Sequence, residues 1–292
     1  MINLSLQVRH AVPQDHRQIA NLLLHEANTH RHLDWRPALE WVGSQNYWVL
    51  EEDGRITAAL ACPEDPPQVA WIRLFAHQPH LSGLETWTAL SRVAFPEIIR
   101  TDPQAQVAAI VMKQWFQNIL FSHGFELKQN IVLLHWSGDT ARTFNVPQGI
   151  KIRLMQQSDL FAITKVDLAS FGHFWHNTFD ALQRAYSQAV YATVSEDGSG
   201  VIGYQISTGN PFGAHLARLA VLPEAQCRGV GAALVNDLIQ RMNIHQSARL
   251  SVNTQADNAA SLTLYERMGF KRTGEYFPVL VFRPSITPAS AS

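Results

Sequence analysis

Hydrophobic and polar positions along the chain change from a strand-like to a helical period around one loop. An apolar run at Leu219–Leu222 predicts a strand that ends at Pro223. A loop with two glycines follows, and apolar residues then recur at helical spacing, at Leu234, Leu238, Ile239 and Met242. The pattern therefore predicts a strand, a glycine-containing turn and a helix in direct succession.

The turn from Gln226 to Ala232 has the features of an anion-binding site. The first amides of a helix have no intrahelical acceptor and lie at the positive end of the helix dipole. Glycines at 229 and 231 remove the Cβ atoms that would hold a phosphate away from these amides, and Arg228 adds a positive charge. The alternative interpretation is a tight strand-to-helix turn without a ligand, which the glycines alone do not exclude.

Short motifs recur in the two halves of the chain at a nearly constant distance. Arg9 and Arg153 each precede a helical pattern and lie 144 positions apart, as do the Asp-Gly hairpin signals at Asp53 and Asp197. Two further pairs lie at an offset of 145, namely Ile72-Arg73-Leu74 with Ala217-Arg218-Leu219 and Gly124-Phe125 with Gly269-Phe270. This repetition predicts two copies of one α/β domain, at residues 1–140 and 150–292, with a linker around 137–149.

The two copies differ at the glycine turn. The first copy keeps a predicted strand at Trp71–Ala76, but the segment after it contains a single glycine, Gly83. At the offset of 145, the key positions Gln226, Gly229 and Gly231 correspond to Leu81, Leu84 and Thr86. A phosphate is therefore not expected to bind residues 1–140, for which the sequence favours a structural or substrate-shaping role.

The segment that follows the turn and its helix predicts another strand, at 249–253, and then a second helix. Asp257 or Asn258 is suited to the N-cap, and Gly269 to the left-handed residue that ends the helix. Tyr265 lies within this helix, where a partly buried aromatic residue whose hydroxyl binds a carbonyl is the ordinary interpretation.

Composition and charge narrow the classes of function. The 292 residues are 46% hydrophobic and 16% charged, as in an ordinary globular protein, and the net charge is −1. We therefore expect neither a nucleic-acid partner nor a membrane partner. None of the 13 histidines has a convincing metal-ligand spacing, so no metal is expected. Two cysteines and the lack of a signal or membrane-spanning pattern predict a soluble cytoplasmic protein.

Two motifs together resemble a known family. Gln226-Cys-Arg-Gly-Val-Gly-Ala232 resembles the Gln/Arg-x-x-Gly-x-Gly/Ala signature of the GNAT acyltransferases. Asn258-x-x-Ala-x-x-Leu-Tyr-x-x-x-Gly-Phe270 is similar to the motif that follows it in that family. The resemblance covers residues 150–283, and the first copy resembles the same fold with eroded motifs. It implies two tandem domains, each with a mixed, largely antiparallel central sheet flanked by helices.

The resemblance also implies roles for individual residues toward acetyl-CoA or another acyl-CoA. The backbone of Leu219, Ala220 and Val221 would pair with the pantetheine arm. The pyrophosphate would lie on amides of the turn, made by Gln226, Cys227, Arg228, Gly229, Val230, Gly231 and Ala232. Asn258 would lie near the pantetheine or the phosphates, and the Tyr265 hydroxyl would protonate the departing CoA thiolate.

Candidates for the base and for acceptor binding are less constrained. By period-two alternation His215, Leu219 and Val221 share one strand face, and His215 stands where several family members carry a glutamate base. An inert, partly solvated histidine is the alternative. Asn253 could position a water molecule. The aromatic segment 171–177, with His173 and Trp175, forms either a wall of the acceptor pocket or part of a helix corner.

The sequence therefore favours an acetyl-CoA-dependent N-acyltransferase, active in the second domain, that acetylates a small-molecule amine. A non-catalytic acetyl-CoA sensor is the alternative. A dinucleotide-binding enzyme is disfavoured, because the glycine pattern is one short and no acidic residue follows at the required distance. The chain is expected to be a monomer or homodimer. Amino acids, polyamines, aminoglycosides, peptide amines and thiol-glycoside precursors all remain open as acceptors.

Overall fold

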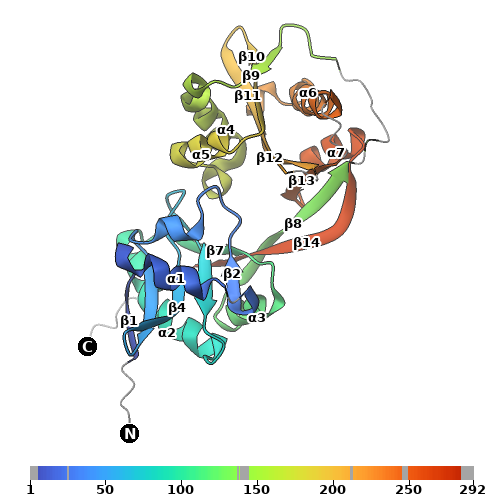
Figure 1. Cartoon of the computed structure of the whole chain (residues 1–292). Coiled ribbons are helices and arrows are strands. Elements are labelled where there is room, and N and C mark those ends of the chain that lie inside the picture. Colours follow the sequence, from blue (N-terminus) through green and yellow to red (C-terminus); the bar gives the residue numbers. More distant parts are fainter. Residues whose placement is uncertain are drawn as a thin grey trace, which may run out of the picture. The chain divides into compact units, whose positions relative to one another are not determined.

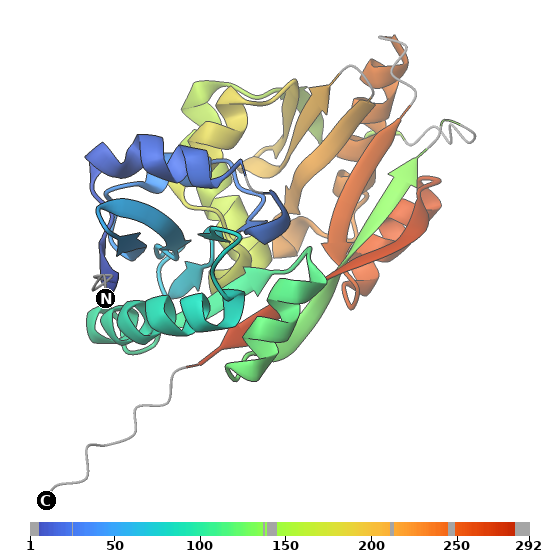
Figure 2. The same cartoon turned by 60° about the horizontal axis from the view of Figure 1, so that its bottom comes forward.

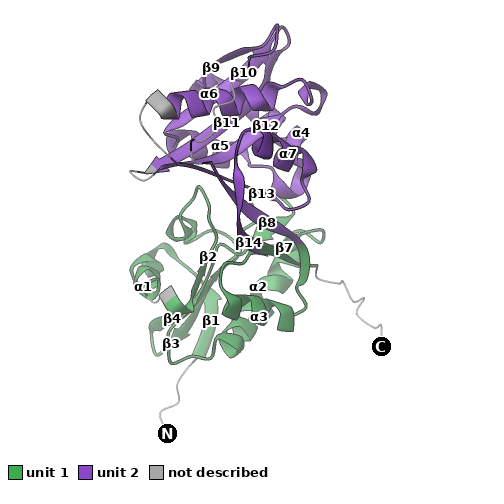
Figure 3. Ribbon diagram, turned by 90° about the vertical axis from the view of Figure 1, so that its right-hand side faces the viewer, with its two compact units in different colours: residues 1–128, 278–292 green, residues 129–277 purple. Residues whose placement is uncertain are grey.

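The chain forms two compact units that do not follow its order strictly. A computed structural model describes residues 6–24, 26–136, 138, 145–210, 213–244 and 249–283. Unit 1 comprises Met1–Lys128 and Pro278–Ser292, and unit 2 comprises Gln129–Phe277 (Figure 3). The sequence predicted domains at 1–140 and 150–292; the units differ from these in that 129–136 lies in unit 2 and 278–292 in unit 1.

Unit 1 contains an antiparallel sheet and a second, mixed group of strands. The antiparallel sheet has the order β1-β3-β4-β6-β2. Its strands are β1 (Leu6–His10), β2 (Thr29–Arg31), β3 (Tyr47–Glu52), β4 (Arg55–Ala61) and β6 (Leu74–His77), and the helix α1 (His16–Leu22) follows β1. The other elements are β5 (Val69–Trp71), α2 (Gly83–Thr101), β7 (Gln106–Ile110) and α3 (Gln114–Ser122). β7 pairs parallel with β5 and antiparallel with Val279–Phe282.

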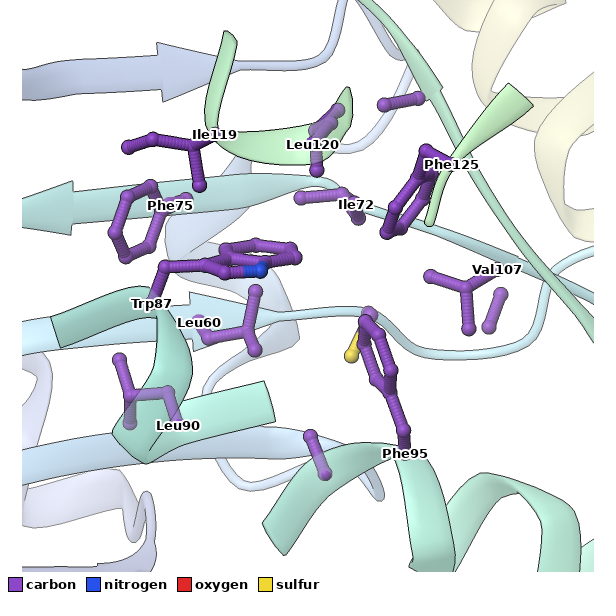
Figure 4. Packing of buried hydrophobic residues seen from close by; sticks show 14 of the residues in the cluster. Leu60, Ile72, Phe75, Trp87, Leu90, Phe95, Val107, Ile119, Leu120 and Phe125 are labelled. Carbon is purple, nitrogen blue, oxygen red and sulfur yellow. The ribbon is translucent and has the colours of Figure 1, made fainter. Parts of the chain in front are cut away.

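Aromatic side chains make the main core of unit 1. Trp87 of α2 is fully buried and packs edge-on against Phe75 of β6, with 5.2 Å between ring centroids (Figure 4). Phe116 and Phe125 approach the same indole at 5.4 and 6.1 Å. Burial of such large apolar side chains is the main stabilising contribution in a domain of this size. Unit 1 is therefore a well-packed domain although its glycine turn is missing.

Unit 2 is one mixed sheet covered by helices on both faces. Its strand order is β14-β8-β13-β12-β11-β10-β9, in which β12 and β13 are parallel. The strands are β8 (Glu126–Trp136), β9 (Lys151–Leu154), β10 (Tyr191–Asp197), β11 (Gly200–Asn210), β12 (Gly213–Val221), β13 (Leu250–Gln255) and β14 (Lys271–Phe282). The helices are α4 (Leu160–Trp175), α5 (Phe179–Ser187), α6 (Val230–Ile244) and α7 (Ala259–Arg267). Figures 1 and 2 show α4 and α5 on one face and α6 and α7 on the other.

An ion network that occurs in both units confirms the internal repeat. Arg9 donates to Glu51 from Nε at 2.7 Å and to both carboxylate oxygens of Asp15 at 2.7 and 3.0 Å. Arg153 makes the same contacts in unit 2, at 2.8 Å to Glu196 and at 2.7 and 2.9 Å to Asp159. In each unit the arginine thus ties the first strand to the hairpin.

The network also shows where the offset changes. Arg9 and Arg153 are 144 positions apart, but Glu51 and Glu196 are 145 apart, so one residue is gained between the first strand and the hairpin. Asp53 lies in the turn of its hairpin, with Glu52 paired to Arg55. Asp197 instead pairs with Gly200. The predicted correspondence of Asp53 with Asp197 is therefore off by one residue.

Two strands cross between the units in opposite directions. β8 starts in unit 1, and its residues Ile131–Trp136 pair antiparallel with β13 of unit 2. β14 starts in unit 2 and ends in unit 1, where Val279–Phe282 pair with β7. In each unit, one strand pairing is therefore completed by residues that belong in sequence to the other repeat: β8 pairs with β13 of unit 2, and the end of β14 pairs with β7 of unit 1. Across the described ranges, no helix is both long and apolar enough to cross a lipid bilayer.

Candidate functional site

β12 and β13 diverge along their length. They pair only from Ala214–Leu250 to Leu216–Val252, although β12 continues to Val221. On its other edge β12 stays paired with β11, and the amide of Leu222 donates to Ile202 at 2.8 Å. Backbone groups alternate between the two edges of an antiparallel strand, so this bond directs the peptide groups of Leu219 and Val221 away from β11. Beyond Leu216 this edge of β12 is open, in that no described strand pairs with it. The carbonyl of Val221 on this edge accepts from the side chains of Ser170 and Gln226, both at 3.0 Å.

A β-bulge corrects the predicted faces of β12. Ile206 lies opposite Arg218, whereas Ser207 lies opposite Leu216, so Ala217 has no partner on β11. The extra residue reverses the alternation of side chains beyond it. His215 therefore shares a face with Arg218, while Leu219 points to the other face with Leu216. The prediction that His215, Leu219 and Val221 share one face was wrong for this reason.

The turn after β12 forms a concave loop of backbone amides. Cys227 and Gly229 both have left-handed backbone conformations, with φ of 59° and 84°. Alternation of left- and right-handed residues directs successive N–H groups inward, an arrangement that binds anions. The first helical bond into the loop is donated by Ala233 to Gly229 at 3.0 Å. The amides of Val230, Gly231 and Ala232 therefore have no intrahelical acceptor.

The two glycines of the loop serve different purposes. Gly229 is needed for its positive φ, which other residues adopt at a cost. Gly231 lies in a tight space, because a Cβ there would lie 3.3 Å from Leu264 of α7 and 3.9 Å from Val221, and Leu264 would have to shift slightly. Arg228 is half exposed and reaches Asp197 at 3.7 Å, a weak surface pair that leaves its guanidinium accessible.

Helix α7 places Asn258 and Tyr265. The Asn258 side chain accepts from the amide of Ser261 at 3.0 Å, which confirms it as the N-cap, and Gly269 ends the helix with φ of 91°, as predicted. Tyr265 is 4% exposed and lies in the core shared by α6 and α7, with its ring 5.5 Å from that of Phe270. Burial raises the pKa of its phenol above the usual value, so the hydroxyl keeps its proton at neutral pH.

In unit 1, the strand edge that corresponds to the open edge of β12 is paired with another strand. The counterparts of Leu219–Val221, at the offset of 145, are residues 74–76 of β6. There β2 pairs with β6, with Thr29 opposite Ala76, His30 opposite Phe75 and Arg31 opposite Leu74. The predicted strand Trp71–Ala76 is also broken into β5 and β6, which pair with different neighbours. An added strand therefore occupies in unit 1 the edge that an extended ligand could take in unit 2.

A buried ion network that the sequence does not predict holds β12 to α4. Asp167 is fully buried and accepts from Arg218 at 2.7 and 2.8 Å and from the hydroxyl of Tyr204. Arg218 also donates to the carbonyl of Trp175 at 2.7 Å and lies 3.5 Å from the ring centroid of Phe171. The aromatic segment 171–177 is thereby anchored beside the bulge. Its His173 is exposed, and the Trp175 ring packs edge-on against Phe174.

Replacement of Arg218 by methionine is expected to destabilise the protein by about 3–5 kcal/mol, because it leaves the Asp167 charge buried without its partner. Chemical denaturation measures this loss. Arg241→Met is the matched control, since Arg241 is part of a surface pair with Asp237, at 3.3 Å, and is expected to cost about 0–1 kcal/mol. Equal effects of the two substitutions would contradict a structural role of the Arg218 pair.

His215 lies beside a polar cavity at the paired end of β12. Its Nδ1 atom is 2.9 Å from the hydroxyl of Ser251, which in turn donates to the carbonyl of Ala214 at 3.4 Å. Burial, and the nearby His135, lower the pKa of the His215 imidazole below 6.5. His215 and His135 both line a cavity of about 400 Å³. Asn253 follows on the same face of β13 and is exposed, at the point where the two strands separate.

Comparison with known proteins agrees with this geometry. Residues 160–270 match the model of the acetyltransferase (GNAT) family. The chain is 27% identical over 137 residues to probable N-acetyltransferase family 8 member 5 of Mus musculus, covering 45% of this chain and 52% of that protein. It is 37% identical over 68 residues to the ribosomal protein bS18-alanine N-acetyltransferase of Escherichia coli K12, covering 22% and 46%. The chain thus spans about half the length of these curated relatives.

Solved structures extend the likeness to both units. A GCN5-related N-acetyltransferase from Sphaerobacter thermophilus has a TM-score of 0.62 at 17% identity, over 96% of this chain and 97% of that one. A tandem GNAT protein from the clavulanic acid biosynthesis pathway has a TM-score of 0.65 at 13% identity, over 96% and 100%. At such identities the likeness establishes the fold. The chain has the tandem GNAT fold, and its segment 160–270 belongs to the GNAT acetyltransferase family.

Proposed function

We propose that unit 2 transfers an acetyl group from acetyl-CoA to the amine of a small molecule. The observation that carries this proposal is the open edge of β12 at Leu219–Val221, which leads directly into the amide loop at 226–232. The GNAT family uses acetyl-CoA, a thioester with a long, extended pantetheine arm and a pyrophosphate. The edge suits the arm and the loop suits the pyrophosphate.

The arrangement of unit 1 supports this use of the edge. There β2, an extended segment of the chain itself, occupies the corresponding edge of β6. The fold thus accommodates an extended backbone at this place, and in unit 2 the described strands leave it open. We therefore expect one acetyl-CoA per chain, bound by unit 2.

We assign His215 as the general base that removes a proton from the acceptor amine. An ammonium must lose a proton before its nitrogen can attack a carbonyl carbon. We assign the tautomer in which Nδ1 of His215 donates to the Ser251 hydroxyl, whose own proton is directed to the carbonyl of Ala214. This tautomer leaves Nε2 of the neutral imidazole as the basic nitrogen. The lowered pKa keeps the imidazole in this neutral form at pH 7. His215 would take one proton from the ammonium, and the lone pair that this frees on the nitrogen would then attack the thioester carbonyl carbon.

We assign Tyr265 as the acid that donates a proton to the departing CoA thiolate. As the C–S bond breaks, the sulfur becomes a thiolate and gains from a hydrogen-bond donor. The phenol of Tyr265 is protonated at neutral pH because burial raises its pKa. We assign the pyrophosphate to the backbone amides of residues 226–232. Asn258, whose side chain caps α7, is assigned a place beside the pantetheine arm or the phosphates.

Calorimetry and thermal unfolding with acetyl-CoA test the proposal. We expect one binding site per chain. At about 100 times Kd the ligand should stabilise the protein by about 2.7 kcal/mol, which raises Tm by roughly 5–10 °C. Binding without release of free thiol in the presence of any amine would indicate the sensor instead. Two sites per chain would contradict the expectation that β2 closes unit 1.

Replacement of Tyr265 by phenylalanine is expected to lower kcat by about 10²-fold, with little change in acetyl-CoA affinity, because only the proton donor is removed. Steady-state thiol release and calorimetry measure the two quantities. Tyr47→Phe is the matched control, since it also removes the hydroxyl of a buried tyrosine, but from β3 of unit 1, to which no step of the reaction is assigned. An unchanged kcat in Tyr265→Phe would remove the residue from the reaction.

A further inference from the structure

We infer that the acceptor is a small amine that also carries an oxyanion group, a carboxylate or a phosphate, and that Arg249 binds this group. The inference rests on the proposed function and concerns the cavity beside His215. It excludes polyamines and aminoglycosides, whose further groups are cationic, as the preferred acceptors.

The cavity is built on a row of polar side chains across four neighbouring strands. In the strand register, His215 of β12 lies opposite both Thr208 of β11 and Ser251 of β13, and Ser251 lies opposite His135 of β8. Side chains directly opposite one another share a face of the sheet. This row therefore forms one polar surface, and the cavity of about 400 Å³ above it has the size of a small-molecule site.

The charges around the cavity favour an anion. None of the residues that line it carries a carboxylate, and they include Arg249, His135 and His215. Arg249 forms no ion pair among those found in the described part of the chain, so its charge is available to a ligand. A second ammonium on the acceptor would be repelled here, whereas a carboxylate or phosphate would accept two parallel bonds from the guanidinium.

The position of the cavity connects it with the reaction. His215 directly precedes Leu216, the last residue of β12 that pairs with β13, so it stands where the open edge begins. Arg249 lies two positions before Ser251, which is about 7 Å along a strand. An amine held at His215 and an oxyanion held at Arg249 are therefore separated by the length of a small amino-acid-like molecule.

One residue that lines this cavity, His135, comes from the first repeat. It belongs by sequence to the first copy of the repeat, but the crossing strand β8 carries it into unit 2 and next to Ser251. His135 also contributes to the lowered pKa of His215. The second copy alone, from residue 150 onward, would lack this wall of the cavity.

Matched pairs of acceptors test the inference with the full chain. Thiol release from acetyl-CoA is measured with glycine against glycinamide, with 2-aminoethyl phosphate against ethanolamine, and with putrescine. We expect kcat/KM to be about 10- to 100-fold higher for the anionic member of at least one pair. Carboxylate and phosphate are distinguished by which pair shows the preference. In Arg249→Gln the preference should disappear, and in Arg249→Lys part of it should return.

Arg241→Gln is the control, because Arg241 is on α6, on the other face of the sheet, and should keep the preference. Acetyl-CoA binding is measured for every variant. If the wild-type chain does not bind acetyl-CoA, the proposed function fails. If it binds, three results would each overturn the inference alone: equal rates within both pairs, a preference for putrescine, or an unchanged preference in Arg249→Gln.

Discussion

Replacement of His215 by alanine is expected to lower kcat by about 10²- to 10⁴-fold, the usual contribution of a positioned base. Acetyl-CoA affinity should change little, because His215 lies on the paired part of β12, before the open edge. Steady-state kinetics at saturating acetyl-CoA and calorimetry separate the two quantities.

The pH dependence gives a sharper test of the same residue. A base must be neutral to act, and the pKa of His215 is lowered below 6.5 by burial. In the wild-type protein the acidic limb of kcat/KM should therefore have its midpoint below pH 6.5, with full activity at neutral pH. In His215→Ala this limb should be absent.

Ser251→Ala provides an intermediate case, because it removes the hydroxyl that orients the imidazole but keeps the imidazole itself. A smaller loss of kcat with the acidic limb retained is expected. If His215→Ala keeps both its rate and its acidic limb, the base is elsewhere.

Replacement of Gly229 by valine is expected to weaken acetyl-CoA binding by at least about 100-fold. The glycine has φ of 84°, a conformation that β-branched residues strongly disfavour, so the loop would have to rearrange and its amides would no longer converge. A Cβ would also lie 3.4 Å from Pro147. Calorimetry with acetyl-CoA measures the loss of affinity.

Gly54→Val is the matched control for strain. Gly54 has φ of 77° and lies in the β3–β4 turn of unit 1, where a Cβ would have no other atom within 4 Å. This variant should lose similar stability but bind acetyl-CoA normally. Unaltered binding in a folded Gly229→Val protein would show that the loop amides do not hold the cofactor.

The features that the sequence predicted are those encoded by neighbouring residues. The N-cap at Asn258 and the end of α7 at Gly269 depend on contacts within three or four positions, and the helix α6 depends on its own apolar period. The repeat was visible because the same short motifs return at a fixed offset. Such local patterns also marked the loop at 226–232.

The features that it missed depend on partners far along the chain. The bulge at Ala217 cannot be seen in β12 alone, because only the register with β11 defines it. Asp167 and Arg218 are 51 positions apart, and nothing in either local pattern indicates a buried pair. The placement of β2 on β6 and the crossing of β8 and β14 are likewise set by tertiary packing. The arginine that recurs at 73 and 218 was a signal available in the sequence. In the structure both arginines pair with an aspartate, Arg73 with Asp34 at 2.6 Å and Arg218 with Asp167.

The crossing of β14 has a consequence for the order of events during synthesis. Val279–Phe282 complete the strand pairing of β7, yet they leave the ribosome after all of unit 2. Until then one edge of β7 has unpaired backbone groups, which are prone to pair with other chains. The edge of unit 1 at β7 therefore stays unpaired until this strand is made. A nascent chain arrested before residue 279 is expected to be more sensitive to protease than the full chain.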